Sequence, residues 1–254
     1  DDLAEDVQLA DAPGDELRAI DWNIYRRLGR VFLRLFEEFE DLPVYLAPDI
    51  SRSMFHGERP RAHAGLRAAF ALAAAALNHH DSVGLFPFAD ELRVALQPRS
   101  GRVRMMRMAE ELAKQQPGGT TDFAKSLGKF ARMGLRPGLL VVVSDFFDPG
   151  GIEAVRESLS RQRHRLLLVQ LTRKTDQNPD LSGDLLLRDC ENGQEHDVSV
   201  TSDVLAAYRR AYETFEQSLH QLAMSQQAGL VRIDVEEPVV PQLSSLFASG
   251  AFVV

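Results

Sequence analysis

The stretch GLLVVVSDFFD, residues 138–148, decides the fold. It opens with a glycine, continues as an unbroken run of leucine and valine from Leu139 to Val143, and reaches an acidic side chain at Asp145. β-Branched side chains favour strands, and an apolar run without polar alternation is typical of a strand buried on both faces of a parallel sheet. The sequence therefore predicts a buried parallel strand with a carboxylate at its carboxyl end.

Strands and helices alternate on both sides of this strand. Apolar runs at 42–48 and 165–171 predict further buried strands, and the alanine-rich pattern at 61–80 predicts a helix. The other expected elements are strands over 31–39, 81–90, 92–98 and 230–235 and helices over 103–115, 122–133, 151–162, 202–228 and 240–248. This order is typical of a doubly wound α/β fold, with a mostly parallel sheet and helices on both faces.

Two features add to this fold. The strand expected over 31–39 is an extra N-terminal strand, and Asn192-Gly193, between two short strand-like runs, indicates a β-hairpin insertion with a two-residue turn. The sequence contains no internal repeat and no clear linker. We therefore expect one domain over 31–254, on which an N-terminal extension of residues 1–30 packs.

The composition excludes several classes of function. The 254 residues carry 37 acidic and 29 basic side chains, a formal charge of −8, so the overall field disfavours nucleic acid as a partner. The single cysteine, Cys190, excludes an intramolecular disulfide and a cysteine zinc cluster. The longest apolar stretch, 68–77, is too short to span a bilayer. We expect a cytoplasmic protein without a membrane segment in this chain.

Oxygen-bearing side chains follow the ends of the predicted strands. The strand at 42–48 leads into Asp49-Ile50-Ser51-Arg52-Ser53, and Asp145 follows the strand at 139–143. Thr121 follows a glycine pair at the start of a predicted helix. The carboxyl ends of parallel strands meet at one edge of the sheet, where α/β proteins bind ligands. The candidate metal site comprises Asp49, Ser51, Ser53, Thr121 and Asp145.

Carboxylates and hydroxyls without sulfur or imidazole are ligands that suit a hard cation, Mg²⁺ or Mn²⁺. An octahedral ion needs six oxygens, so these five side chains leave at least one position for an outside ligand. Because three of the five are neutral hydroxyls, the ion keeps excess positive charge, which favours an incoming carboxylate. We therefore expect a site that binds an exposed Asp or Glu of a partner protein through a divalent ion.

The same pattern, D-x-S-x-S after one strand, a threonine in a later loop and an aspartate after a further strand, resembles the metal-ion-dependent adhesion site (MIDAS) of von Willebrand factor A domains. Thr121 is chosen over Thr120 because the family's threonine lies six residues before an apolar helix position, here Leu127. What the resemblance implies is a metal-binding module for protein–protein interaction.

A closer resemblance covers residues 13–54, with the run G-D-x-x-R-x-I-D-W at 14–22, and the form S-D-F-F-D at 144–148. These segments look like a bacterial von Willebrand A-like family of unknown function, whose genes commonly lie beside those of MoxR-type AAA+ ATPases. This resemblance implies a chaperone-like, metal-dependent module that assists such an ATPase in the assembly or maturation of complexes. It implies no enzyme activity.

One residue departs from the family pattern. Pro48 precedes Asp49, where the family carries an ordinary apolar residue, and proline has no N–H to donate to a strand ladder. Asp49 would be displaced unless the nitrogen of Pro48 faces out of the ladder.

Two alternative functions stay open. A magnesium-dependent phosphohydrolase would use Asp49 as its nucleophile, although such chemistry usually needs a second acid two residues later, where this chain has Ser51. A metal-free scaffold is the other, suggested by Pro48. Thr121 and Asp145 also match a purely structural role, as N-caps of the helices that follow them.

Overall fold

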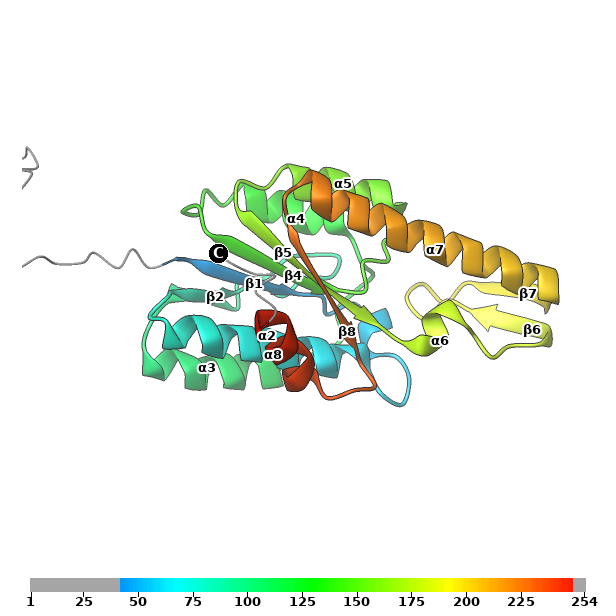
Figure 1. Ribbon diagram of the computed structural model, residues 1–254, viewed down its shortest axis with the longest axis horizontal. Coiled ribbons are helices and arrows are strands. Elements are labelled where there is room, and N and C mark those ends of the chain that lie inside the picture. The colour runs from blue at the N-terminus through cyan, green and yellow to red at the C-terminus, as the bar shows by residue number, and fades with distance from the viewer. Residues whose placement is uncertain (1–41, 249–254) are drawn as a thin grey trace, which may run out of the picture. The chain divides into compact units, whose positions relative to one another are not determined.

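The computed structural model describes residues 42–248 (Figure 1). Contacts divide the chain into two units, Asp1–Glu40 and Asp41–Val254, and the described residues all belong to the second. The strand expected over 31–39, the extension over 1–30 and most of the family-like segment 13–54 lie outside the described residues.

Six strands form one sheet in the order β3-β2-β1-β4-β5-β8. The parallel strands are β1 (Val44–Pro48), β2 (Val83–Leu85), β4 (Leu139–Ser144), β5 (Arg165–Thr172) and β8 (Gly229–Asp234). β3 (Leu96–Arg99), which contains Pro98, pairs antiparallel with β2 and forms one edge. The apolar run at 139–143 is β4, which pairs with both β1 and β5, so the predicted mostly parallel sheet is confirmed.

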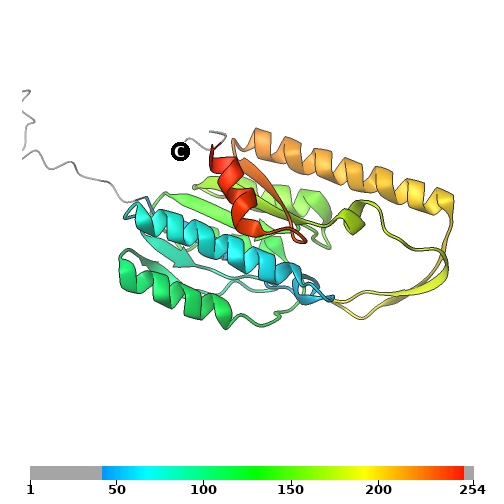
Figure 2. The same cartoon turned by 60° about the horizontal axis from the view of Figure 1, so that its bottom comes forward.

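Helices cover both faces of this sheet, as Figure 1 and Figure 2 show. One face carries α2 (Arg61–Asn78), α3 (Arg102–Ala113) and α8 (Val239–Ala248), and the other carries α4 (Phe123–Ala131), α5 (Gly151–Ser160) and α7 (Ser202–Ser225). Each face has its own buried apolar cluster. No helix within 42–248 combines the length and the apolar character needed to cross a bilayer.

Small side chains let α2 lie close to the sheet. Its buried face consists mainly of alanine, and a Cβ on Gly65 would come within 2.9 Å of the Leu171 side chain on β5 and 3.3 Å of Val143 on β4. The alanine content that predicts this helix from sequence therefore has a second cause, because larger residues on this face would push α2 off the sheet.

The strand order reverses between β1 and β4. The chain passes from β1 through α2 to β2 on one side, and β4, β5 and β8 extend the sheet on the other side. At such a reversal the connections leave in opposite directions, which opens a crevice at the carboxyl ends of the two strands. The topology therefore places the segment after β1 and the segment after β4 at one ligand-binding edge.

Pro48 does not displace Asp49. The Asp49 N–H donates to the Val143 carbonyl on β4 at 2.8 Å, and the Phe88 N–H donates to the Pro48 carbonyl at 3.0 Å. The missing N–H of Pro48 falls just past the end of β2 at Leu85, and Ile50 resumes the pairing by donating to the Phe88 carbonyl at 2.8 Å. The condition under which Pro48 is tolerated is therefore met, because its nitrogen lies at the end of the ladder and backbone bonds hold the end of β1 from both sides.

The insertion between β5 and α7 contains the predicted hairpin. A short helix, α6 (Lys174–Gln177), is followed by the paired strands β6 (Gly183–Arg188) and β7 (Glu195–Val200). The turn is wider than the two residues expected, because Arg188 pairs with Glu195 and the Asp189 N–H donates to the Gln194 carbonyl at 2.8 Å. The Asp189 carboxylate accepts hydrogen bonds from backbone N–H groups of this wider turn and so stabilises it. Gly193 adopts the positive φ of 75° that the turn requires.

Candidate metal site at the sheet edge

The five predicted site residues lie at the edge where the strand order reverses. Asp49 follows β1 and Asp145 follows β4, and the two carboxylates are close enough for the charge of Asp145 to raise the pKa of Asp49. Ser51 Oγ lies 3.0 Å from Ser53 Oγ, and Ser53 and Thr121 contact one and the same carboxylate. The structure therefore brings the whole predicted set together, with the side chains of all but Ser53 buried.

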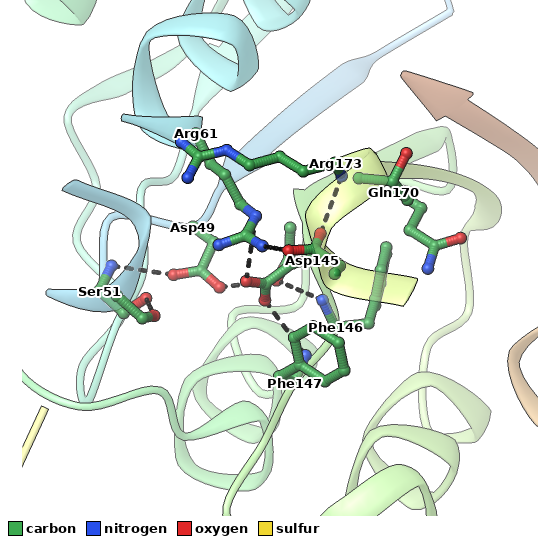
Figure 3. A network of polar contacts seen from close by, with 12 residues as sticks. Asp49, Ser51, Arg61, Asp145, Phe146, Phe147, Gln170 and Arg173 are labelled. Atoms are coloured by element: carbon green, nitrogen blue, oxygen red, sulfur yellow. Dashed lines mark hydrogen bonds and ion pairs between the residues drawn. The ribbon is translucent and has the colours of Figure 1, made fainter. Parts of the chain in front are cut away.

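Asp49 is fixed by two hydrogen bonds to its carboxylate (Figure 3). Its Oδ1 accepts from the Ser51 N–H at 2.9 Å, and its Oδ2 accepts from Ser144 Oγ at 2.6 Å. The first bond is a local aspartate turn that reverses the chain as it leaves β1. Ser144 was not among the predicted residues, although its position before Asp145 on the neighbouring strand places it opposite Asp49.

Two buried apolar residues bracket the hydroxyls of the segment after Asp49, and exposed Arg52 lies between the two serines. Ile50 and Met54 are buried in the core, and the residues between them lead into a short 3₁₀ helix, η1 (Ser53–Phe55). The anchors fix the backbone, so the hydroxyls of Ser51 and Ser53 stay together on the side of the carboxylates. The positions of these buried anchors therefore explain why the two serines are spaced as they are in the D-x-S-x-S pattern.

A glycine pair brings Thr121 to this segment. The Gly118 N–H donates to the Ile50 carbonyl at 2.6 Å, and the Gly119 carbonyl accepts from the Arg52 N–H at 3.1 Å. A Cβ on Gly118 would lie 2.7 Å from the Ala89 Cβ and 3.1 Å from the Ile50 oxygen. Only a residue without a side chain allows so close an approach.

Asp145 sits beside a strained backbone residue. Phe146 adopts a φ of 63°, which is unusual for a bulky residue, and its ring is fully buried against Phe123 at 5.8 Å between centroids. The Phe146 N–H donates to Ser144 Oγ at 2.9 Å, and the Phe147 N–H donates to Asp145 Oδ1 at 3.2 Å. Packing and these bonds hold the chain in a sharp turn directly after β4.

Neither Thr121 nor Asp145 acts as a helix N-cap. The N-cap of α4 is Asp122, whose side chain accepts from the Lys125 N–H at 2.8 Å, and the N-cap of α5 is Gly150. The structural alternative for these two site residues is therefore wrong.

Arg61 is a site residue that the sequence reasoning missed. Its Nε is buried, has no hydrogen-bond partner among the described residues and lies 3.8 Å from Asp145 Oδ2, whereas its terminal nitrogen pairs with Asp176 after β5. Figure 3 shows the guanidinium above the Asp145 carboxylate. A signal was present, because an arginine in the first turn of α2 opposes the helix dipole and so indicates a nearby anion.

Burial and mutual repulsion make the two carboxylates resist ionisation. Burial, and then the charge of Asp145, raise the pKa of Asp49 to about 7, although bonds from Ser144 and Ser51 act in the opposite direction. Burial also raises the pKa of Asp145, to about 6, although Arg61 lowers it. Because Arg61 compensates only Asp145, and is divided between it and Asp176, the two buried acids are short of positive charge.

The third carboxylate at the site belongs to Glu191, in the hairpin turn. Glu191 Oε1 accepts from Ser53 Oγ at 2.7 Å and from Thr121 Oγ1 at 3.1 Å, and Oε2 accepts from the Thr121 N–H at 3.1 Å. Nothing in the local sequence around Glu191 predicts this contact, since the hairpin lies 138 positions from Ser53 in the chain.

The donor set fits a hard divalent cation. It offers carboxylate and hydroxyl oxygens. Within residues 42–248 no three His, Cys, Asp or Glu side chains group closely enough to hold an ion by themselves, so the hydroxyls would have to complete the ligand set. Asp49, Ser51, Ser53, Thr121 and Asp145 are the residues that would hold such an ion.

Residues 11–220 match the family model described as "Protein of unknown function DUF58". The chain belongs to this family. Uncharacterized proteins of Mycobacterium tuberculosis and Mycobacterium bovis are 26% identical to the DUF58 chain over 205 residues, which cover 78% of it and 64% of each relative. The chain thus spans less than two thirds of the length of these curated relatives.

One solved structure similar to the DUF58 chain supports its fold. The conserved hypothetical protein BatB from Bacteroides thetaiotaomicron is 16% identical, with a TM-score of 0.52 over 83% of this chain and 98% of that one. The von Willebrand factor domain of the pilus tip protein Mfa5 from Porphyromonas gingivalis also matches, at 13% identity and a TM-score of 0.35, over 41% of this chain and 38% of that one. The predicted α/β fold and the membership of a family of unknown function are confirmed.

Replacing Asp49 with asparagine tests the buried pair of charges. In metal-free protein the folded-state pKa of about 7 lies above the unfolded value of 3.8, so the fold loses stability as the pH rises from about 4 through about 7. In EDTA we expect Asp49→Asn to raise Tm more at pH 8 than at pH 5. The stabilisation of the variant relative to the wild type should be larger at pH 8 than at pH 5 by about 2 kcal/mol, which is roughly 4–8 °C in Tm by differential scanning calorimetry.

The matched control is Asp184→Asn, which removes the same charge from an exposed position on β6. This control should change Tm by similar small amounts at the two pH values. An Asp49→Asn effect that is equal at pH 5 and pH 8 would contradict a buried carboxylate that is forced to ionise.

Substitution of Gly118 tests how Thr121 is placed. Because the new Cβ would overlap Ala89 and the Ile50 carbonyl, Gly118→Ala should lower stability by about 1–3 kcal/mol in urea denaturation. Gly128→Ala in α4 is the control, since its Cβ would meet only the Arg132 guanidinium at 3.6 Å and alanine favours a helix. Equal stability of the two variants would show that the glycine is not required for the close approach.

Proposed function

We propose that this protein is an interaction module that holds a divalent cation, Mg²⁺ or Mn²⁺, at the sheet edge and binds the carboxylate of an Asp or Glu on a partner protein through it. One observation carries the proposal: two buried carboxylates and three hydroxyls from three separate segments converge where the strand order reverses. Helix capping does not account for Thr121 or Asp145, and no local role explains why all five side chains converge.

The spacing of the hydroxyls supports this proposal. With metal–oxygen distances of about 2.0–2.1 Å, neighbouring ligands of an octahedral Mg²⁺ lie about 3 Å apart. Ser51 Oγ and Ser53 Oγ are 3.0 Å apart. Two hydroxyls at this separation can share a cation without a change of backbone.

The charge of the site also supports a cation. Arg61 is divided between Asp145 and Asp176 and forms no ion pair with Asp49, a residue that is only 2% exposed. A buried carboxylate without a nearby positive charge is costly, and a divalent ion would compensate both aspartates at once. When bound, the ion would supply a Lewis-acidic position for an outside oxygen ligand.

Binding rather than catalysis is the activity we propose. Both oxygens of Asp49 accept hydrogen bonds, from Ser144 and Ser51, and the side chain is buried, so Asp49 is poorly placed to attack a phosphoryl group. Ser51 stands where a phosphohydrolase would carry its second acid. Assays with a generic phosphate ester should therefore show no turnover that depends on Asp49.

The identity of the partner comes from resemblance alone. The family-like segments imply a MoxR-type AAA+ ATPase, and we propose such an ATPase, or a complex that it assembles, as the source of the acidic side chain. Co-purification of the two proteins in Mg²⁺, and its loss in EDTA, is the expected result.

Titration with metal tests the proposed site directly. We expect isothermal titration calorimetry to show binding of Mn²⁺ to the wild type and at least a tenfold weaker binding to Ser51→Ala, because a direct oxygen ligand is lost. Ser126→Ala is the matched control. Ser126 is as fully buried as Ser51, but it donates to the Ala89 carbonyl at 2.9 Å, away from the carboxylates.

The control variant should lose stability but keep the Mn²⁺ affinity of the wild type. Two results would count against the proposal: a wild type that binds no Mn²⁺ at millimolar concentration, or equal losses of affinity in the two serine variants. The second result would mean that Ser51 acts only through the fold.

A further inference from the structure

We propose that Glu191, in the turn of the β6–β7 hairpin, is an internal ligand of the metal site and takes the position that a partner's carboxylate would occupy. This inference rests on the proposed function. It adds a site residue from an insertion that lies outside the D-x-S-x-S segment, the threonine loop and the segment after β4.

The carboxylate of Glu191 is shared by two of the three site hydroxyls. Oε1 lies 2.7 Å from Ser53 Oγ and 3.1 Å from Thr121 Oγ1, while Ser53 Oγ lies 3.0 Å from Ser51 Oγ. All three separations are close to the edge of about 3 Å expected between neighbouring ligands of an octahedral Mg²⁺. One oxygen of Glu191 is therefore placed as a further ligand beside the two hydroxyls.

The hairpin turn is built to present this side chain. Asp189 Oδ1 accepts from the Glu191 N–H at 2.7 Å and from the Asn192 N–H at 3.3 Å, and Asn192 Nδ2 donates to Asp189 Oδ2 at 2.8 Å. The Glu191 carbonyl accepts from Arg52 at 3.2 Å, so a second bond docks the turn on the segment after β1. The turn is thus ordered by its own hydrogen bonds, and Glu191 attaches it to the segment after β1 and to the threonine loop.

Glu191 is half-buried, whereas its neighbours Cys190 and Asn192 are exposed. In Figure 1 and Figure 2 the hairpin projects beyond the sheet beside α7, and its turn reaches back toward η1. Glu191 is thus partly buried because its side chain contacts the metal site, and not because the hairpin has an apolar core of its own.

Electrostatics alone disfavours this arrangement. Glu191 brings a third negative charge toward Asp145, which Arg61 compensates only in part. A divalent cation between the hydroxyls and the carboxylates would turn this repulsion into attraction. The position of Glu191 is therefore the one expected of a metal ligand supplied by the chain itself.

An internal ligand would compete with a partner's carboxylate for the same position on the metal ion. A tethered carboxylate competes at an effective concentration in the millimolar range, about that of short flexible linkers. A partner's Asp or Glu then binds only while the hairpin turn is released, and its apparent affinity falls in proportion to that fraction. Partners that also hold the released hairpin would overcome this competition.

Mn²⁺ and acetate are the probes for the experiment. Compared with the wild type, Glu191→Gln and Glu191→Ala should bind Mn²⁺ roughly tenfold more weakly, because a charged ligand is lost. Each bound ion should also relax solvent protons more strongly, because water enters the vacated position. Adding millimolar acetate should reverse this gain in relaxation in the Glu191 variants and change nothing in the wild type.

Glu195→Gln is the matched control, since it removes the same charge from an exposed residue of the same hairpin. Glu195 Oε1 lies 4.0 Å from Arg188 Nε, away from the metal site. It should behave as the wild type does. Wild-type affinity, relaxation and acetate response in both Glu191 variants would overturn the inference, while Mn²⁺ binding that still depends on Ser51 would leave the proposed function intact. Absence of Mn²⁺ binding in the wild type would overturn both.

The single cysteine gives an independent measurement. Cys190 is exposed and adjacent to Glu191, so one nitroxide label on it reports the mobility of the hairpin turn. With Mg²⁺ present, the label should be restricted in the wild type and in Glu195→Gln and more mobile in Glu191→Gln. Equal mobility in all three proteins would show that the carboxylate does not hold the turn at the site.

Discussion

Two acidic side chains buried side by side are the constraint on which this site depends. Asp49 and Asp145 leave neighbouring parallel strands, whose spacing of about 4.8 Å prevents the carboxylates from separating. Serine hydroxyls, backbone N–H groups and half of one arginine reduce the cost of this proximity without removing it. A fold that keeps such a pair retains a local deficit of positive charge, which is the property that a cation site needs.

The surrounding loops serve to keep that pair in place. Gly118 lets the threonine loop bond directly to Ile50, and the left-handed backbone of Phe146, fixed by its buried ring, turns the chain away immediately after Asp145. The close approach at Gly118 restricts that position to glycine, and the left-handed backbone of Phe146 is unfavourable by itself. The fold maintains both features because the closely packed, alanine-rich α2 and the two apolar cores leave the sheet edge little freedom to relax.

Much of this architecture is predictable from sequence, because its signals are local. The uninterrupted valine run of β4, the alanine face of α2 and the placement of Asp49 and Asp145 after strands all depend on neighbouring residues. Long-range features were not predictable. The tolerance of Pro48 depends on where β2 ends, and the contact of Glu191 depends on how the hairpin folds back. Arg61 had a local signal, its conflict with the helix dipole, which periodicity alone does not register.

The edge strand β3 has a consequence for how the folded protein behaves at high concentration. A sheet edge with a full row of free backbone donors can recruit a strand from another molecule and begin aggregation. β3 is only four residues long, and Pro98 removes one of its donors. Charged Arg99 ends the strand, so this side of the sheet is a poor template for the self-association that open β-edges otherwise promote.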